Sequence, residues 1–154
     1  MSKIEDKIES LVKDKIEELG YELYDVLFLK EGKNLILRIV IDSKDGISLD
    51  DCENVNNNIK EIIDNEDPIQ EQYFLEISSP GIERLLRKEW QLKKFINNEV
   101  EIKLFKKDDS GNKNYIGVLN SVEKDYLTII DSEENIIKID RKNITQVKTV
   151  YKED

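Results

Sequence analysis

The 154-residue sequence contains no histidine, one cysteine and two prolines. No apolar run approaches the ~20 residues of a membrane span, and the charged N-terminus MSKIEDKIES lacks the apolar segment of a signal peptide. Without imidazole, a Ser-His-Asp triad and histidine-dependent zinc sites are excluded. The lone Cys52 excludes an internal disulfide and agrees with a reducing compartment. Neither G-x-x-x-x-G-K-[ST] nor G-x-G-x-x-G occurs. We therefore expect a cytoplasmic protein that is not an enzyme, with no catalytic residues, metal or cofactor.

Charged residues are abundant but unevenly distributed. The chain has 34 Asp and Glu against 24 Lys and Arg, a net charge of −10. Residues 1–75 hold nine basic and 19 acidic side chains, whereas residues 84–113 hold nine basic and five acidic ones. This asymmetry predicts two modules with different partners, because the basic segment would attract a phosphate backbone that the acidic half would repel.

The first forty residues change from a helical period to a strand period. Apolar side chains recur at helical spacing over residues 4–19, and Gly20 follows at the position of a C-terminal cap. Residues 21–29 and 35–41 have the composition and alternation of strands. The intervening KEGKN supplies a turn, so the two strands are predicted to form a hairpin.

A second helix and a third strand follow the hairpin. Ser48 is a good N-cap, and Asp51 stands three residues later in the position of a capping box. Pro68 closes the helix, and residues 72–78 alternate as a strand. The order α-β-β-α-β predicts two helices on one face of a three-stranded sheet.

The last third of the chain breaks into short apolar runs separated by polar turns, which predicts a small SH3-like or Sm-like β-barrel. The five predicted strands lie near residues 100–105, 115–122, 126–131, 135–140 and 144–150. The expected fold class is therefore α+β. Its parts are an N-terminal domain at 1–79, a junction with a short helix at 80–97, and a C-terminal barrel at 98–154.

The junction LEISSPGIERLL changes abruptly from apolar to basic. Pro80 and Gly81 favour a turn, although Ser79 could instead cap a short helix that begins at Pro80. One interpretation is a domain linker with solvated basic side chains. The other is that hydroxyls, a glycine backbone and guanidinium groups converge on a partner.

The same stretch resembles the signature of the RimP family of bacterial ribosome maturation factors, Ser-Ser-Pro-Gly-[Leu/Ile]-[Asp/Glu]-Arg-Pro-Leu. GISLDDC upstream and YIGVLNSV downstream are also similar to family segments. Leu85 departs from the family's proline, which puts the backbone rigidity after Arg84 in question. Asn97 and Asn98 stand where a glycine is frequent, although asparagine tolerates a left-handed φ. The matching positions are Ser78, Ser79, Pro80, Gly81, Glu83, Arg84 and Leu86.

The resemblance implies an α-β-β-α-β domain followed by an SH3-like barrel, in agreement with the residue patterns. It also implies a non-enzymatic factor that binds the immature small (30S) ribosomal subunit in the cytoplasm and assists its assembly and rRNA maturation. Its expected partners are rRNA and a basic ribosomal protein near the decoding region, and we expect a monomer with no membrane association. The candidate partner-binding residues are Ser78, Ser79, Pro80, Gly81, Arg84, Arg87, Lys88, Lys93, Lys94, Lys106, Lys107 and Lys113.

Two other functions stay open at this point. A small barrel could act as a free-standing RNA-binding regulator of messenger RNA. Carboxylates at Asp42, Asp45, Asp50 and Asp51 could serve a metal-dependent hydrolase, although a turn and a helix N-terminus also account for them.

The aromatic residues near the basic segment admit two interpretations. Trp90, Phe95, Phe105 and Tyr115 could stack on exposed bases. The spacing of Leu86, Trp90 and Phe95 instead favours a short helix packed on the barrel, so we expect Trp90 in the core.

Overall fold

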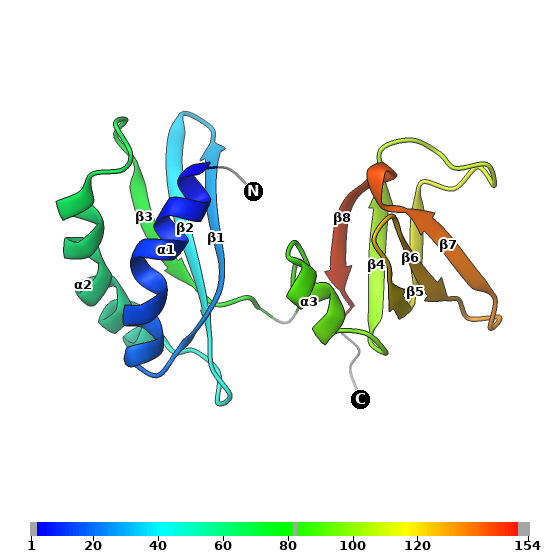
Figure 1. The fold of residues 1–154 in the computed structure, drawn as a ribbon, viewed down its shortest axis with the longest axis horizontal. Helices are drawn as coiled ribbons and strands as arrows, with labels where there is room; N and C mark the ends of the chain where they lie inside the picture. The colour runs from blue at the N-terminus through cyan, green and yellow to red at the C-terminus, as the bar shows by residue number, and fades with distance from the viewer. Residues whose placement is uncertain (1–2, 82, 151–154) are drawn as a thin grey trace. The chain divides into compact units, whose positions relative to one another are not determined.

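The computed structural model describes residues 3–81 and 83–150, and the chain divides into two compact units, Met1–Pro80 and Gly81–Asp154 (Figure 1). The predicted 98–154 segment therefore ends in four residues that lie outside the described part. The first unit contains α1 (Lys3–Glu18), β1 (Glu22–Glu31), β2 (Asn34–Asp42), α2 (Leu49–Glu66) and β3 (Phe74–Ser78). The second contains α3 (Glu89–Lys94), β4 (Glu99–Leu104), β5 (Asn114–Val122), β6 (Tyr126–Ile130), β7 (Ile136–Asp140), η1 (Arg141–Asn143) and β8 (Ile144–Thr149).

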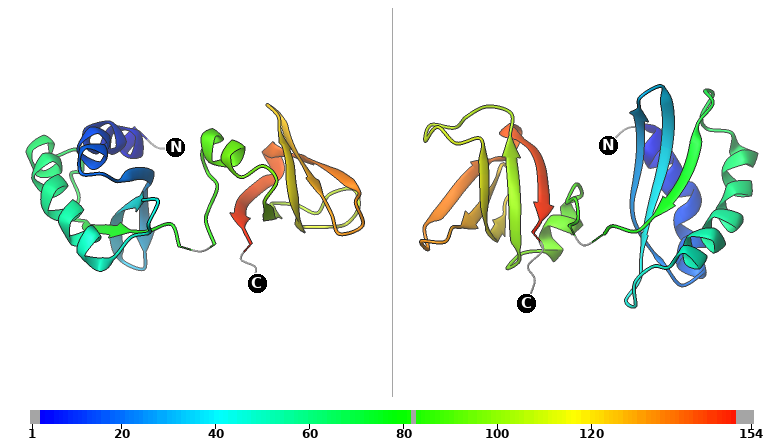
Figure 2. Two further views of the ribbon diagram at one scale, coloured as in Figure 1. Left: turned by 90° about the horizontal axis from the view of Figure 1, so that it is seen from below. Right: turned by 180° about the vertical axis from the view of Figure 1, so that it is seen from behind.

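In the first unit, both helices cover one face of a sheet with the order β1-β2-β3 (Figure 2). β1 and β2 are antiparallel and joined by a two-residue turn in which Gly32 has a φ of 62°. β3 runs parallel to β2, with Leu37 opposite Leu75, because α2 carries the chain back across the sheet. The predicted α-β-β-α-β order is confirmed. The core is built from Ile8, Val12, Ile16, Leu23, Val26, Leu37, Ile39, Ile41, Val55, Ile59, Ile63 and Ile69.

The helix ends follow the predicted local signals. Gly20 has a φ of 96°, and the Tyr21 N–H donates to the Ile16 carbonyl at 3.1 Å, which closes α1. At the start of α2, the Ser48 hydroxyl accepts from the Asp51 N–H at 3.1 Å, and Asp51 accepts from the Ser48 N–H at 2.8 Å. This reciprocal pair is the predicted capping box.

The second unit is a five-stranded antiparallel sheet with the order β7-β6-β5-β4-β8. All five predicted strands are present. β7 and β8 are the outer strands and do not pair with each other within residues 83–150, so the pairing there is that of an open sheet. Gly117 in β5 is required by space, because a Cβ there would lie 2.7 Å from the Ile130 carbonyl oxygen of β6. The core residues are Leu86, Leu92, Val100, Ile102, Leu104, Leu119, Leu127, Ile129, Ile139 and Val147.

Among the residues described, no helix combines the length and apolar character needed to cross a membrane.

Candidate nucleic-acid interface

The Ser-Ser-Pro-Gly sequence lies where the first unit ends. Ser78 is the last residue of β3 and pairs with Val40, Ser79 is exposed, and Pro80 is half-buried. Gly81 has a φ of 79°, a conformation that side chains rarely adopt. This is the backbone conformation that the predicted Pro-Gly turn requires of its glycine, whereas the turn itself stays a prediction because position 82 lies outside the described residues.

The backbone of residues 84–86 pairs with β8 of the second unit. The Arg84 N–H donates to the Thr149 hydroxyl at 2.8 Å, and the Thr149 N–H donates back to the Arg84 carbonyl at 2.9 Å. The Leu86 N–H donates to the Val147 carbonyl at 2.9 Å, and the Leu86 side chain is buried. The signature motif thus extends the sheet beyond the outer edge of β8, and its backbone has a structural role.

This pairing explains how leucine is tolerated at position 85. Leu85 forms a bridge opposite Lys148, and the two flanking backbone hydrogen bonds use the N–H groups of Leu86 and Thr149. These two hydrogen bonds do not use the N–H of residue 85, so they are compatible with either leucine or proline at that position. The sequence left open whether the backbone after Arg84 is rigid without a proline. Pairing with β8 holds this backbone in place instead.

Five basic side chains surround α3, and together they form what we call the α3 surface. Arg87, Lys93 and Lys94 are exposed, whereas Arg84 and Lys88 are half-buried. The Arg84 Nε lies 3.4 Å from the Gly81 carbonyl oxygen. Glu89 is the one acidic residue between positions 84 and 94, so the segment carries a net charge of +4.

Hydrogen bonds of two polar side chains, Gln91 and Glu89, hold the start of α3 in place. Gln91 is fully buried, and its Oε1 accepts from the N–H groups of Arg87 at 2.7 Å and Lys88 at 3.0 Å. The Arg141 guanidinium binds the Glu89 carboxylate with two contacts of 2.9 Å. These hydrogen bonds lower the pKa of Glu89. The α3 surface is therefore presented by a short helix anchored at both its first turn and its buried face.

The expectation that Trp90 lies in the core is wrong. Its side chain is 38% exposed, and Lys94 Nζ lies 5.9 Å from the ring centroid. Leu86 and Leu92 fill the apolar space beneath the helix instead, while Phe95 is half-buried. Trp90 contributes an aromatic side chain to the α3 surface.

A second basic surface lies on the loop between β4 and β5. Lys106, Lys107 and Lys113 are exposed there, and none forms an ion pair with another residue in the described ranges. Phe105 precedes them and is 61% exposed. We call these four residues the loop surface.

Side chains from two directions hold the loop in shape. The Asn143 amide accepts from the Lys106 N–H at 3.1 Å and donates to the Lys106 carbonyl at 3.0 Å. Across the loop, Asp108 accepts from the Tyr115 hydroxyl and from the Asn112 N–H. The hydrogen bond from Tyr115 is the main cause of the lowered pKa of Asp108. The pKa of Tyr115 is raised mainly by burial, and then by its hydrogen bond to Asp108. The loop surface is therefore ordered before any partner binds.

The two surfaces are separated along the chain by β4. α3 precedes this strand and the loop follows it, so they lie at opposite ends of a strand about 20 Å long (Figure 1). Both are braced by η1, because Arg141 holds Glu89 and Asn143 holds Lys106. The basic residues predicted as one set thus form two surfaces with a common support.

Several residues that carry or support the basic surfaces were not predicted from the sequence. Lys142 is exposed in η1 between the two bracing residues, in one of the polar stretches that the sequence predicts only as turns between strands. Gln91 could have been found, since it stands three residues after Lys88 at the position where a capping-box residue occurs. Arg141 and Asn143 act across long sequence separations and have no local signal.

Two of the four carboxylates considered for a hydrolase, Asp42 and Asp51, accept hydrogen bonds that hold local structure. Asp51 belongs to the capping box and also accepts from the Tyr21 hydroxyl at 2.6 Å. Asp42 accepts from the Ser43 N–H at 2.9 Å, while Asp45 and Asp50 are exposed. No group of three or more potential metal ligands occurs within residues 3–81 and 83–150.

Comparison with known families places the first unit. Residues 11–83 match the family model of the RimP N-terminal domain, just under half of the chain. The match spans the second half of α1, all of the elements from β1 to β3, and the Ser-Ser-Pro-Gly sequence, and it ends one residue before Arg84.

Proposed function

Because residues 11–83 match the N-terminal domain of the RimP family of ribosome maturation factors, we propose that the chain is a member of this family, binds the immature small (30S) ribosomal subunit and assists its assembly and rRNA maturation without catalysis. The match to the RimP N-terminal domain is the observation that carries this proposal. The two basic surfaces of the second unit supply a physical means of contact.

The second unit contacts rRNA through the α3 surface and the loop surface. Their lysine and arginine side chains neutralise phosphates and release counterions, which makes the affinity fall with rising salt. Fixed supports favour this use, since anchored side chains lose less conformational freedom on binding. Lys142 adds a further positive charge on η1, the element that braces both surfaces.

Phe105 and Trp90 extend the contact from phosphates to bases. Phe105 is directly followed by Lys106, so an unpaired base stacked on its ring brings its phosphate near a positive charge. Trp90 offers a similar pairing with Lys94. Immature rRNA exposes single-stranded segments of the kind that such side chains bind.

The first unit suits a protein partner. Residues 1–80 hold nine Lys and Arg against twenty Asp and Glu, a net charge of −11, whereas residues 81–154 hold 15 against 14. An acidic unit attracts basic ribosomal proteins and repels the rRNA backbone, which selects partners and accelerates encounter. Two units of opposite preference could therefore hold a basic protein near the rRNA that it must join.

The second unit belongs, in this proposal, to the SH3-like class of small barrels. The order β7-β6-β5-β4-β8 and the single turn of η1 before the last strand support this assignment. The segment around Leu85, which covers the outer edge of β8, gives further protection to an edge that would otherwise stay open.

Gradient sedimentation of a cell extract tests the function. We expect the protein to travel in the cytoplasmic fraction with small-subunit precursors, and purified protein to be monomeric. Migration with polysomes or free message would contradict the proposal and favour regulation of messenger RNA. A magnesium-dependent nuclease activity lost in Asp50→Asn would instead indicate a hydrolase.

A further inference from the structure

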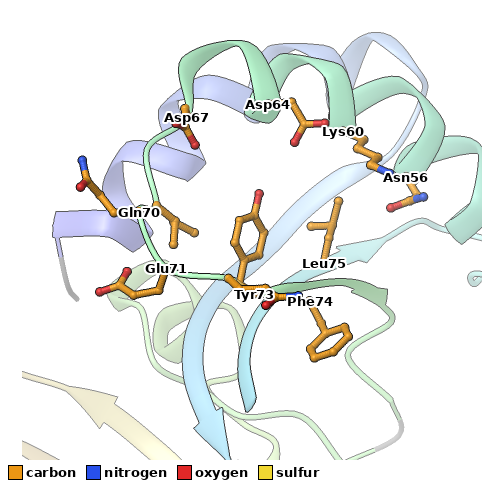
Figure 3. Close-up of a pocket in the computed structure, with 11 residues that line it drawn as sticks. Asn56, Lys60, Asp64, Asp67, Gln70, Glu71, Tyr73, Phe74 and Leu75 are labelled. Atoms are coloured by element: carbon orange, nitrogen blue, oxygen red, sulfur yellow. The ribbon is translucent and has the colours of Figure 1, made fainter. Parts of the chain in front are cut away.

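The first unit has a groove between α2 and the outer edge of its sheet, with a volume of about 620 Å³ (Figure 3). One wall is formed by the second half of α2, which contributes Lys60 and Asp64. The other wall is formed by Tyr73, which directly precedes β3, and by Leu75 of β3, and both side chains point toward the helix. Phe74 points away from them, to the opposite face of the sheet, and is 58% exposed.

Acidic side chains dominate the rim of this groove. Asp64, Asp67 and Glu71 are all exposed, and Lys60 is the one basic residue among the lining residues. The pKa of Tyr73 is raised first by burial and then by the charges of Asp64 and Asp67. The groove therefore combines an apolar floor with a negative rim.

The two edges of the sheet differ. On β1, the buried Glu5 of α1 accepts the Phe28 N–H at 2.8 Å, so a helix side chain occupies part of that edge. Along β3, the backbone groups that face away from β2 make no hydrogen bond within the described residues. Exposed strand edges are templates for another strand unless they are blocked by charge or by covering elements.

We propose that β3 and its groove bind an extended, lysine- and arginine-rich peptide, which adds to the sheet as a fourth strand. In such a strand, alternate side chains face opposite sides. Basic side chains on one side reach Asp64, Asp67 and Glu71, and apolar ones on the other side pack against Phe74. A second copy of this chain is disfavoured as the occupant, because each first unit carries a net charge of −11. The inference rests on the proposed function in one respect, namely that the first unit meets a basic protein.

The test uses the full chain and a labelled synthetic peptide of about ten residues in which Lys and Val alternate. We expect hydrogen-exchange protection of the backbone amides of residues 74–78 when the peptide binds. The triple variant Asp64→Asn, Asp67→Asn, Glu71→Gln should bind about eightfold more weakly, at roughly twofold for each exposed ion pair. Asn at position 67 keeps the left-handed φ of 42° found there.

Two controls separate strand addition from general attraction. The matched variant Asp6→Asn, Asp14→Asn, Glu17→Gln removes three exposed carboxylates from α1 and should change affinity less than twofold. A peptide that is N-methylated at alternate residues keeps its charge but loses donors, and it should bind at least fivefold more weakly. Equal binding of the methylated peptide, or an equal loss in the α1 variant, would overturn the inference.

Self-association can be read from the same data. Protection of residues 74–78 that rises with protein concentration in the absence of peptide would assign the edge to a second copy and overturn the inference. Because no RNA is present, failure of peptide binding with intact binding to precursors would overturn this inference alone. Intact peptide binding with no binding to precursors would overturn the proposed function alone.

Discussion

Neutralising the loop surface should reduce the salt dependence of binding by a calculable amount. The variant Lys106→Gln, Lys107→Gln, Lys113→Gln removes three exposed charges that have no ion-pair partner in the described structure. Each phosphate contact contributes about 0.7 to 0.9 to the slope of log affinity against log salt. The slope should therefore fall by about 2 to 3. Between ~50 and ~200 mM salt, the wild-type affinity should then drop roughly 20- to 40-fold more than that of the variant.

The assay is equilibrium binding of the labelled chain to purified small-subunit precursors at several salt concentrations. A matched control replaces Lys7, Lys13 and Lys33 of the first unit by Gln, which makes the same change in net charge. We expect the control to keep the wild-type slope. An unchanged slope in the loop variant, or an equal decrease in the control, would refute the assignment of rRNA contacts to this loop.

Three predictions concern the supports of the basic surfaces and can be read from chemical unfolding of the second unit. Gly117→Ala should destabilise it by ~2–3 kcal/mol, since the new Cβ meets the Ile130 carbonyl oxygen of β6. A decrease in the free energy of unfolding below ~0.5 kcal/mol would show that β5 and β6 can move apart at little energetic cost. Asn97 has a φ of 78°, which strains the backbone of a residue with a side chain, so Asn97→Gly should stabilise the unit by ~0.5–1 kcal/mol. A loss of stability in this variant would contradict the presence of such strain. Glu89→Gln should destabilise by ~0.5–1 kcal/mol near neutral pH. Pairing with Arg141 lowers the pKa of Glu89 in the folded chain. The difference in stability between wild type and variant should therefore persist above the unfolded pKa of about 4.3, and disappear as the pH falls through the folded pKa. A stability difference that does not vary with pH would rule out the ion pair as its source.

Local signals predicted most of the fold. The capping box at Ser48 and Asp51 and the cap at Gly20 depend on neighbouring residues, so they could be found without tertiary information. Strand order is different, because the parallel pairing of β3 with β2 joins residues far apart in the sequence. The prediction that Trp90 is buried was wrong for a related reason, because helical spacing alone does not indicate which face of a six-residue helix contacts the sheet.

The candidate interface was only partly accessible from the sequence. Its basic residues are visible as a local excess of charge, and all of the predicted ones lie on the junction, on α3 or on the loop between β4 and β5. The division into two surfaces was not visible, because it depends on where β4 carries the chain. The bracing role of η1 was also hidden, since Arg141 and Asn143 contact residues 52 and 37 positions earlier.

The motif at the junction carries two kinds of information. Its backbone from Arg84 to Leu86 completes the pairing around β8, which is a structural requirement. Gly81, which precedes this pairing, has a positive φ of 79° that favours glycine. In the proposed function the side chains of Arg84 and Arg87 contact the partner, and this contact can be tested by substitution separately from the backbone conformation at Gly81.

The most direct test of the account is crosslinking of the full chain to purified small-subunit precursors, with contacts mapped to individual residues. We expect rRNA crosslinks to concentrate in residues 84–113 and 141–143, and protein crosslinks to concentrate in the first unit. Crosslinks from rRNA that fall mainly within residues 3–78 would contradict the division of roles between the acidic first unit and the basic surfaces of the second unit.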